Sequence, residues 1–109
     1  MKGPLIYYEI KDMYGTDLSS TKKASELRQS ILEEIGLGFN VELDFKDVRS
    51  VTNGWARNVI GIIAKEKGED FVKNHILINN MSKSVRKTML KGIEDILEVK
   101  WINLSNLRI

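Results

Sequence analysis

The segment "FNVELDFKDVRSVTNGWARNVIG" (39–61) decides the fold, because a strand pattern runs directly into a helix pattern. Apolar and polar residues alternate over 39–45, which is typical of a strand with one buried face and one wetter face. After Asn53 the apolar residues follow a helical spacing instead and form a broad apolar arc. They are Trp55, Ala56, Val59, Ile60, Ile62 and Ile63. The segment therefore predicts a strand, a short loop and a buried helix.

The rest of the chain repeats this order of strand and helix. Residues 5–10, 75–79 and 101–104 have the composition of strands, and we expect the last of them at an edge of the sheet. Residues 11–20, "KDMYGTDLSS", should form a loop. Helical spacing recurs over 20–36, with Ser19 or Ser20 as the N-cap, and again over 85–97. Strands that alternate with helices imply an α/β fold. We expect a four- or five-stranded, mostly parallel sheet with about three helices largely on one face.

Composition narrows the class of protein. The 109 residues suit a single domain spanning 1–109, and the chain has no cysteine for disulfides or thiolate chemistry. His75 is the only histidine, so we expect no His-based metal cage. We assign His75 a structural role at the start of a strand, and we expect neither a metal nor a cofactor. No segment has the apolar length of a signal peptide or a membrane span, so we expect a cytoplasmic protein. The net charge of +2 does not by itself indicate nucleic-acid binding.

Three loops should meet at one end of the sheet. In a parallel α/β sheet every helix begins at the carboxyl end of the preceding strand, where such proteins usually place their sites. We define the rim as residues 19–23, 49–55 and 79–87, which contain these three junctions. Its basic residues are Lys22, Lys23, Arg49, Lys83, Arg86 and Lys87. The opposite rim should collect acidic residues, namely Glu33, Glu34, Glu94, Asp95 and Glu98.

This distribution of charge opposes the helix dipole. The N-terminus of a helix is partly positive and prefers acidic side chains, by about 0.3–1 kcal/mol each. The first and third predicted helices have the reverse pattern at both ends, although exposed charges are screened and any single one is often arbitrary. Free backbone N–H groups together with Lys and Arg suit an anion or an acidic protein surface. We therefore hypothesise that the rim is a binding surface.

Two further patterns have simpler interpretations. Asp44 and Asp47 resemble the phospho-acceptor region of a receiver domain, but Glu9 and Asp12 match poorly the acidic pair that such a site requires. We expect Asp44 to lie on the wetter face of the sheet or to accept hydrogen bonds from turn N–H groups. Residues 19–21 carry three hydroxyls, which more often cap a helix than accept a phosphate.

The start of the middle helix holds candidates for contact with a partner. We expect Thr52 or Asn53 to cap this helix and Arg57 to present its charge. Trp55 fits the core, and it would be a partner-binding anchor if it were partly exposed. Binding of nucleic acid needs a basic face with interleaved aromatic residues, and only Trp55 and Tyr14 supply these.

The same segment resembles STAS domains, the fold of sulfate transporters and anti-sigma factor antagonists. In those domains a strand of the form "LDFSGV" leads into a helix of the form "DSSGLGVILG", and "VELDFKDVRSVTNGWARNVIG" (41–61) has that order here. The likeness extends over "SSTKKASELRQSILEEI" (19–35) and "HILINNMSKSVRKTML" (75–90), and covers roughly residues 18–98. The pair Trp55-Ala56 is similar to an aromatic-Ala pair in an uncharacterised bacterial STAS-like branch.

The resemblance implies a regulator rather than an enzyme. STAS antagonists bind a histidine-kinase-like ATPase, often an anti-sigma factor. That kinase phosphorylates a Ser at the start of the helix after the "LDF" strand, which breaks the complex. The Asp-Ser pair of the family falls on Thr52 and Asn53, and Asn53 cannot be phosphorylated. Ser50 and Thr52 carry hydroxyls nearby, displaced from the matching position.

We therefore predict a non-catalytic module for regulatory protein–protein interaction, with a histidine-kinase-like ATPase or another protein as its partner. Its main contact residues are Ser50, Thr52, Asn53, Trp55 and Arg57, and the candidates for phosphorylation are Thr52 and Ser50. The alternative is a binder of nucleic acid or another anionic ligand. That alternative would use Lys22, Lys23, Lys83, Arg86 and Lys87.

Overall fold

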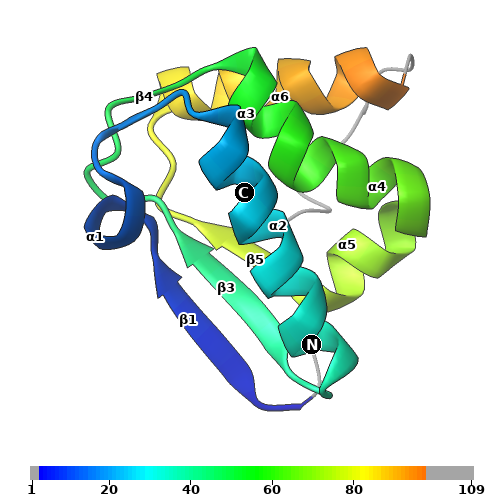
Figure 1. The fold of residues 1–109 in the computed structure, drawn as a ribbon. Coiled ribbons are helices and arrows are strands. Elements are labelled where there is room, and N and C mark those ends of the chain that lie inside the picture. Colours follow the sequence, from blue (N-terminus) through cyan, green and yellow to red (C-terminus); the bar gives the residue numbers. More distant parts are fainter. Residues whose placement is uncertain (1–2, 98–109) are drawn as a thin grey trace.

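The computed structural model describes residues 3–97 and contains a three-stranded parallel sheet (Figure 1). Its strands are β1 (Leu5–Glu9), β3 (Asn40–Asp44) and β5 (Ile76–Asn79), in the order β1-β3-β5. The register pairs Glu9 with Asp44 and Asp44 with Asn79, so the three strands end level with one another. The α/β architecture and the parallel direction of these strands confirm the prediction.

Within the described residues the sheet has fewer strands than the four or five predicted. β2 (Asp17–Leu18) and β4 (Ser50–Val51) form a separate parallel ladder. A two-residue strand is too short to show the alternation that marks a half-buried strand, so the sequence carried no signal for this pair. The strand predicted over 101–104 lies outside the described residues.

The three predicted helices are present. α2 (Thr21–Gly36) begins after Ser20, whose hydroxyl accepts a hydrogen bond from the Lys23 N–H at 3.1 Å, so Ser20 rather than Ser19 is the N-cap. The middle helix runs as α3 (Asn53–Ala56), a π-helical turn η1 (Arg57–Gly61) and α4 (Ile62–Lys67). α6 (Lys83–Leu97) is the third. None of the helices between residues 3 and 97 is long and apolar enough to cross a membrane.

Two short helices were not predicted. α1 (Ile10–Tyr14) follows β1 directly, where a loop was expected, and α5 (Glu69–His75) lies between α4 and β5. Gly68 separates α4 from α5 at a φ of 93°, a conformation that L side chains rarely adopt.

His75 is the last residue of α5, so it ends a helix instead of beginning a strand. Its Nδ1 lies 2.8 Å from Asn40 Oδ1 and its ring packs against Phe71, which confirms the structural role expected of it.

α2 and α4 lie on one side of the sheet, whereas α6 lies beyond its carboxyl end, so the predicted placement of the helices on one face is confirmed only in part (Figure 1). Alternate strand residues on that side are at most 1% exposed and form the centre of the core, namely Val41, Leu43, Ile76 and Ile78. On the opposite face Tyr7 is 54% exposed, as a wetter face requires. Asn40 and Asp44 also belong to that face by alternation, yet both are buried. The second face is therefore drier than the alternation predicted.

The predicted acidic rim does not form. α2 ends at the amino ends of the strands, near the bottom of the view, whereas α6 ends at its upper right (Figure 1). Glu33 and Glu34 are thus separated from Glu94 and Asp95, and Glu98 lies outside the described residues. The reason is the path of α6, which crosses the carboxyl end of the sheet instead of running back along it.

Candidate partner-binding rim

The three segments of the rim are neighbours in space. α2, α3 and α6 all begin at the end of the molecule towards which the strands run (Figure 1). A Cβ at Gly54 would lie 3.4 Å from Thr21 Cγ2, so the starts of α2 and α3 touch. β4 packs against α6, which places residues 50–51 beside the third segment. The topology thus brings loops from three distant parts of the chain onto one surface.

Thr52 caps the middle helix. Its hydroxyl accepts a hydrogen bond from the Trp55 N–H at 3.1 Å, and its backbone has the extended conformation of an N-cap. Asn53 is the first helical residue, so Thr52 is the cap of the two that were predicted. Thr52 and Arg57 are exposed and Asn53 is half-buried. Thr52 and Asn53 therefore reach the surface within the rim, and Arg57 reaches it two residues beyond the second segment.

Trp55 belongs to the core. Its side chain is 1% exposed, and its ring meets the edge of Phe45 at a centroid distance of 6.0 Å and an angle of 89°. The condition for a surface anchor, partial exposure, is not met. The first turn of α3 directs Trp55 inwards, while Thr52 and Arg57 stay outside. Trp55 thus supports the rim from beneath, and its place among the contact residues is corrected accordingly.

Arg49 and Ser50 are held by Asp17. The Asp17 carboxylate accepts hydrogen bonds from Arg49 Nε at 3.1 Å, from Arg49 Nη2 at 2.5 Å and from the Ser50 hydroxyl at 2.6 Å. Hydrogen bonds from Arg49 and Ser50 lower the pKa of Asp17 to about 2, so this carboxylate is ionised at neutral pH. These contacts fasten β2 to β4. The charge of Arg49 is therefore compensated within the chain.

Four of the six basic rim residues are exposed and form no ion pair with another described residue. They are Lys22, Lys23, Lys83 and Lys87. Arg86 is only partly exposed, and its Nε is buried without a hydrogen-bond partner among the described residues. The uncompensated positive charge of the rim thus comes from lysines near the starts of α2 and α6.

The helix starts add to this positive charge. None of α2, α3 and α6 has an acidic residue in its first turn, and neither α2 nor α6 has a basic residue in its last turn. The inverted pattern predicted for the first and third helices is confirmed. Because no carboxylate neutralises the partial positive charge of these N-termini, it reinforces the field of the lysines.

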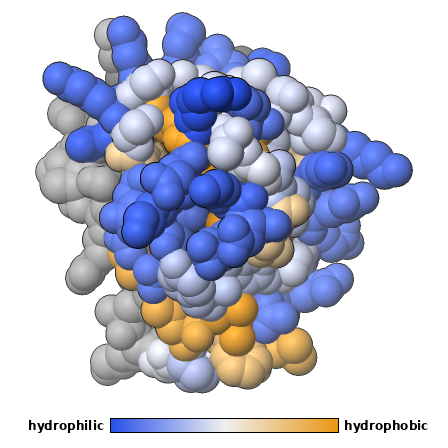
Figure 2. All heavy atoms as spheres, turned by 90° about the vertical axis from the view of Figure 1, so that its left-hand side faces the viewer, coloured by the Kyte–Doolittle hydropathy of each residue, from blue (hydrophilic) through white to orange (hydrophobic). Residues whose placement is uncertain are grey.

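A pocket of about 180 Å³ lies between the start of α2 and Trp55. Its lining consists of Tyr14, Asp17, Leu18, Ser19, Ser20, Lys23 and Trp55. A more open hollow of about 560 Å³ lies at the carboxyl ends of β3 and β5, lined by residues 45–48 and 80–82. Seen from the side of β1 and β4, the upper surface is mainly hydrophilic, and hydrophobic residues gather at the lower end, where β1 begins (Figure 2).

Asp44 is fully hydrogen-bonded at the end of β3. It accepts hydrogen bonds from the Tyr7 hydroxyl, from Asn80 Nδ2 at 3.0 Å and from the Lys46 N–H at 2.9 Å. Burial disfavours ionisation of Asp44, but these hydrogen bonds outweigh it and lower the pKa. The same hydrogen bond to Asp44 raises the pKa of Tyr7 to about 12. The expectation that Asp44 accepts a turn N–H is confirmed.

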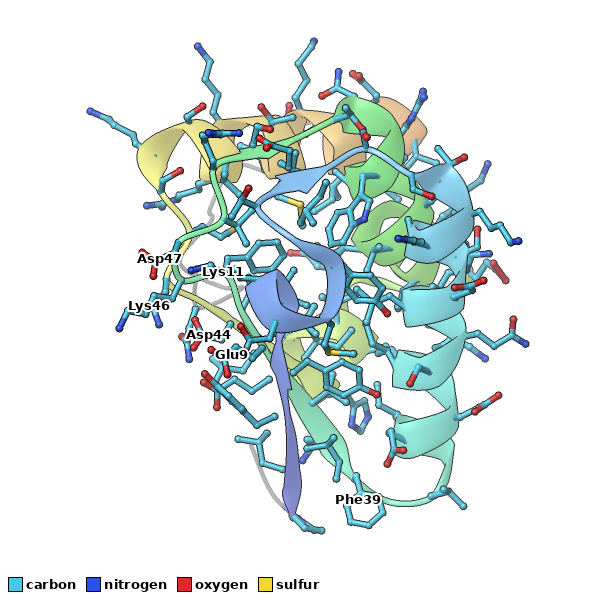
Figure 3. The ribbon with its side chains drawn as sticks, turned by 60° about the vertical axis from the view of Figure 1, so that its left-hand side comes forward. Glu9, Lys11, Phe39, Asp44, Lys46 and Asp47 are labelled. Atoms are coloured by element: carbon cyan, nitrogen blue, oxygen red, sulfur yellow. The ribbon has the colours of Figure 1, made fainter. Side chains whose placement is uncertain are left out.

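Charged residues surround Asp44 without forming a receiver-type site. Glu9, Lys46 and Asp47 lie around it at the ends of β1 and β3 (Figure 3). The neighbouring Asp12 carboxylate raises the pKa of Glu9. Within residues 3–97, however, no group of three or more His, Cys, Asp or Glu side chains is arranged to hold a metal ion. The acidic residues after β1 therefore do not complete the constellation that such a site requires.

The family follows from a comparison with known protein families. The model of the STAS-like domain of unknown function (DUF4325) matches residues 23–86, more than half of the chain. The chain belongs to this STAS-like family. The match begins in the first turn of α2 and ends near the start of α6, so it contains the whole of residues 49–57. No curated protein and no solved structure matches the chain.

The sequence did not predict one residue that holds the rim of this STAS-like domain in place. Asp17 lies in a segment that we expected to be a loop, and its partner Arg49 is 32 residues away. No local pattern links the two residues, and only the pairing of β2 with β4 brings them together. The other predicted contact residues, Ser50, Thr52, Asn53 and Arg57, lie between β4 and the first turn of η1.

Proposed function

We propose that this STAS-like domain is a regulatory module that binds an acidic surface of a protein partner through the rim. The observation that carries the proposal is the set of exposed lysines, Lys22, Lys23, Lys83 and Lys87, which have no ion pair within the described residues. They lie near helix N-termini that carry no acid in the first turn. Lys22, Lys23 and Lys83 lie in first turns, and each costs the free fold roughly 0.3–1 kcal/mol relative to an acidic residue. An acidic partner would reverse that cost.

The proposed contact surface surrounds the start of α3. Thr52, Asn53 and Arg57 reach the surface there, flanked by the lysines of α2 and α6. Trp55 packs beneath them and fixes the position of the helix start. A rigid, charged and shallow surface of this kind suits recognition of a folded protein, because electrostatic complementarity sets orientation and the rate of encounter.

The partner class that we propose is a histidine-kinase-like ATPase. STAS-like domains are generally non-catalytic, and the STAS antagonists that this chain resembles act through partners of that class. The proposal includes no enzymatic activity and no cofactor for this domain. It places the domain in the cytoplasm, where such partners are found.

Regulation by phosphorylation would differ from that of the STAS antagonists. The matching residue is Asn53, which has no hydroxyl. Ser50 and Thr52 remain candidates, and both hydroxyls already have structural partners, Asp17 and the Trp55 N–H respectively. A phosphate on Ser50 would meet the Asp17 carboxylate, and a phosphate on Thr52 would disturb the cap of α3. Phosphorylation at either position would therefore alter the rim.

Site-specific photocrosslinking in the native host tests this proposal. A benzophenone side chain is introduced in place of Lys22 or Lys83 in the rim, and in place of Lys65 on α4 as the control position. Crosslinked products are identified by mass spectrometry. We expect the same protein to be captured from both rim positions and not from Lys65.

Two results would contradict the proposal. Equal capture from Lys65 would show that contact is not centred on the rim. Crosslinking to nucleic acid instead of protein, with an affinity that falls steeply and log-linearly with salt, would favour the alternative function. The burial of Trp55 already removes one of the two aromatic residues that the alternative would use.

A further inference from the structure

We propose that the pocket beside Trp55 is a socket for the carboxylate side chain of an Asp or Glu residue of the partner. This inference rests on the proposed function, since it names the residue class that the rim would receive. The pocket lies within the rim, between the segment that precedes α2 and the first turn of α3. It is lined by residues from both segments, including Ser19, Lys23 and Trp55.

The one carboxylate that lines the pocket already has hydrogen-bond partners. Asp17 is the only carboxylate in its lining, and its two oxygens accept from Arg49, Ser50 and Thr16. The two-point contact with Arg49 compensates its charge. Asp17 therefore offers little to a cation and repels an anion only weakly.

The donors of the pocket are unused. The Lys23 ammonium, the Ser19 hydroxyl and the Tyr14 hydroxyl form no hydrogen bond or ion pair with another described residue. Burial raises the pKa of Tyr14, so its hydroxyl keeps its proton at neutral pH. A ligand group that accepts several hydrogen bonds and carries a negative charge uses all three donors. A carboxylate is such a group.

The size of the pocket favours a side chain over a bare anion. The volume of about 180 Å³ equals that of about six water molecules in the liquid, which exceeds what a single small ion fills. Leu18 and Trp55 also line the pocket, but they are only 3% and 1% exposed and offer little apolar surface to a ligand. A glutamate or aspartate side chain would therefore meet mainly the polar residues of the lining, with its carboxylate at Lys23.

Nuclear magnetic resonance with a small probe tests the socket without the partner. The probe is the α-amide of N-acetyl-L-glutamic acid, and the control ligand is the α-amide of N-acetyl-L-glutamine, which has the same shape and no charge. We expect the glutamate probe to shift the amide signals of Ser19 and Lys23 and the indole N–H signal of Trp55 in a saturable way. The glutamine ligand should bind at least severalfold more weakly.

Two lysines that are neighbours in sequence give matched variants. Lys23→Met removes the ammonium of a residue that lines the pocket, whereas Lys22→Met removes the same charge from a residue outside the lining. We expect Lys23→Met to abolish saturable binding and Lys22→Met to retain it. The Lys23 N–H that meets Ser20 belongs to the backbone, so the cap of α2 survives, and the amide spectra of both variants check the fold.

The outcomes that would overturn the socket are distinct from failure of the proposed function. Equal binding of the glutamate and glutamine ligands, equal effects of the two lysine variants, or no saturable shift in the folded protein would each overturn it. The rim could still capture a protein partner in the crosslinking experiment after any of these results. Conversely, saturable binding of the probe with no partner captured at the rim would contradict the proposed function and leave the socket intact.

Discussion

Asp17 and Arg49 form a two-point ion pair across the rim, with Arg49 Nε 3.1 Å from Oδ1 and Nη2 2.5 Å from Oδ2. The pair joins residues that are 32 positions apart, and the Ser50 hydroxyl strengthens it at 2.6 Å. The consequence is that the loop before α2 and the loop before α3 are held as one unit. The ion pair therefore fixes the relative position of the pocket and of the lysines at the start of α2.

The Asp17 carboxyl should titrate far below its usual range. Its pKa is lowered to about 2 by Arg49 first and Ser50 second, so its contribution to stability is complete above the pKa of the unfolded chain and is lost as pH falls towards 2. Arg49→Gln should raise the Asp17 pKa towards its usual value, and Ser50→Ala should raise it by less. Carbon-detected titration of the Asp17 carboxyl measures both changes. An Asp17 pKa in the usual range in the unmodified protein would contradict the ion pair.

The Thr52 cap should be measurable as stability. Thr52→Ala removes the acceptor for the Trp55 N–H, and loss of an N-cap typically costs about 0.5–2 kcal/mol of unfolding free energy. Thr52→Ser keeps the hydroxyl oxygen and should stay within a few tenths of a kcal/mol of the unmodified protein. Urea denaturation followed by circular dichroism compares the three chains. Equal losses in the Ala and Ser variants would show that the hydroxyl does not cap α3.

Close packing of α6 on α3 should make Gly92 sensitive to a single methyl group. A Cβ at Gly92 would lie 2.7 Å from Ala56 Cβ and 3.0 Å from the Asn53 carbonyl oxygen. Gly92→Ala should therefore destabilise the fold by about 1–3 kcal/mol, the usual cost of overpacking. Gly36→Ala is the matched control, because nothing lies within 4 Å of a Cβ there. A Gly92→Ala variant as stable as the control would mean that α6 packs differently.

Trp55 should be needed for folding rather than for direct contact. Trp55→Ala removes a side chain that is 1% exposed and should cost about 3–5 kcal/mol of unfolding free energy. Trp55→Phe keeps an aromatic ring against Phe45 and should cost clearly less. Thermal unfolding together with partner binding separates the two roles. A folded Trp55→Phe variant that has lost all partner binding would indicate direct contact by the indole.

Much of the fold could be predicted from the sequence because its signals are local. The alternation over 39–45 and the apolar arc after Asn53 each belong to one element, and the parallel order of β1, β3 and β5 follows from strands that alternate with helices. Ser20 and Thr52 were among the expected caps for the same reason. Short elements could not be predicted, because β2 and β4 have two residues each and hydrophobic periodicity cannot be detected over that length.

The parts of the site that could not be predicted depend on contacts between distant residues. Whether Arg49 is free or paired depends on Asp17, and whether Arg86 is exposed depends on how α6 crosses the end of the sheet. The same holds for Trp55, where the helical pattern allowed both a buried and a partly exposed position. The sign of the charges at the helix starts could be predicted from the sequence. Whether each charged side chain is paired or free, and exposed or buried, required the structure.

If the exposed lysines of the rim bind an acidic partner surface, reversing their charge should weaken binding without weakening the fold. Lys22→Glu with Lys83→Glu places acids in the first turns of α2 and α6. Each should stabilise the fold by about 0.3–1 kcal/mol through the helix dipole while replacing attraction to the partner by repulsion. Lys65→Glu with Lys67→Glu is the mirror control in the last turn of α4, where acids should destabilise the fold and leave binding unchanged.

The partner identified by crosslinking is purified without a crosslink and titrated calorimetrically against both double variants. Thermal unfolding of the variants is recorded in parallel. We expect the rim variant to be at least as stable as the unmodified domain and to bind at least about tenfold more weakly, which is about 1.4 kcal/mol. The control variant should be less stable and should bind normally. A rim variant that folds and binds with unchanged affinity would show that these lysines do not contact the partner.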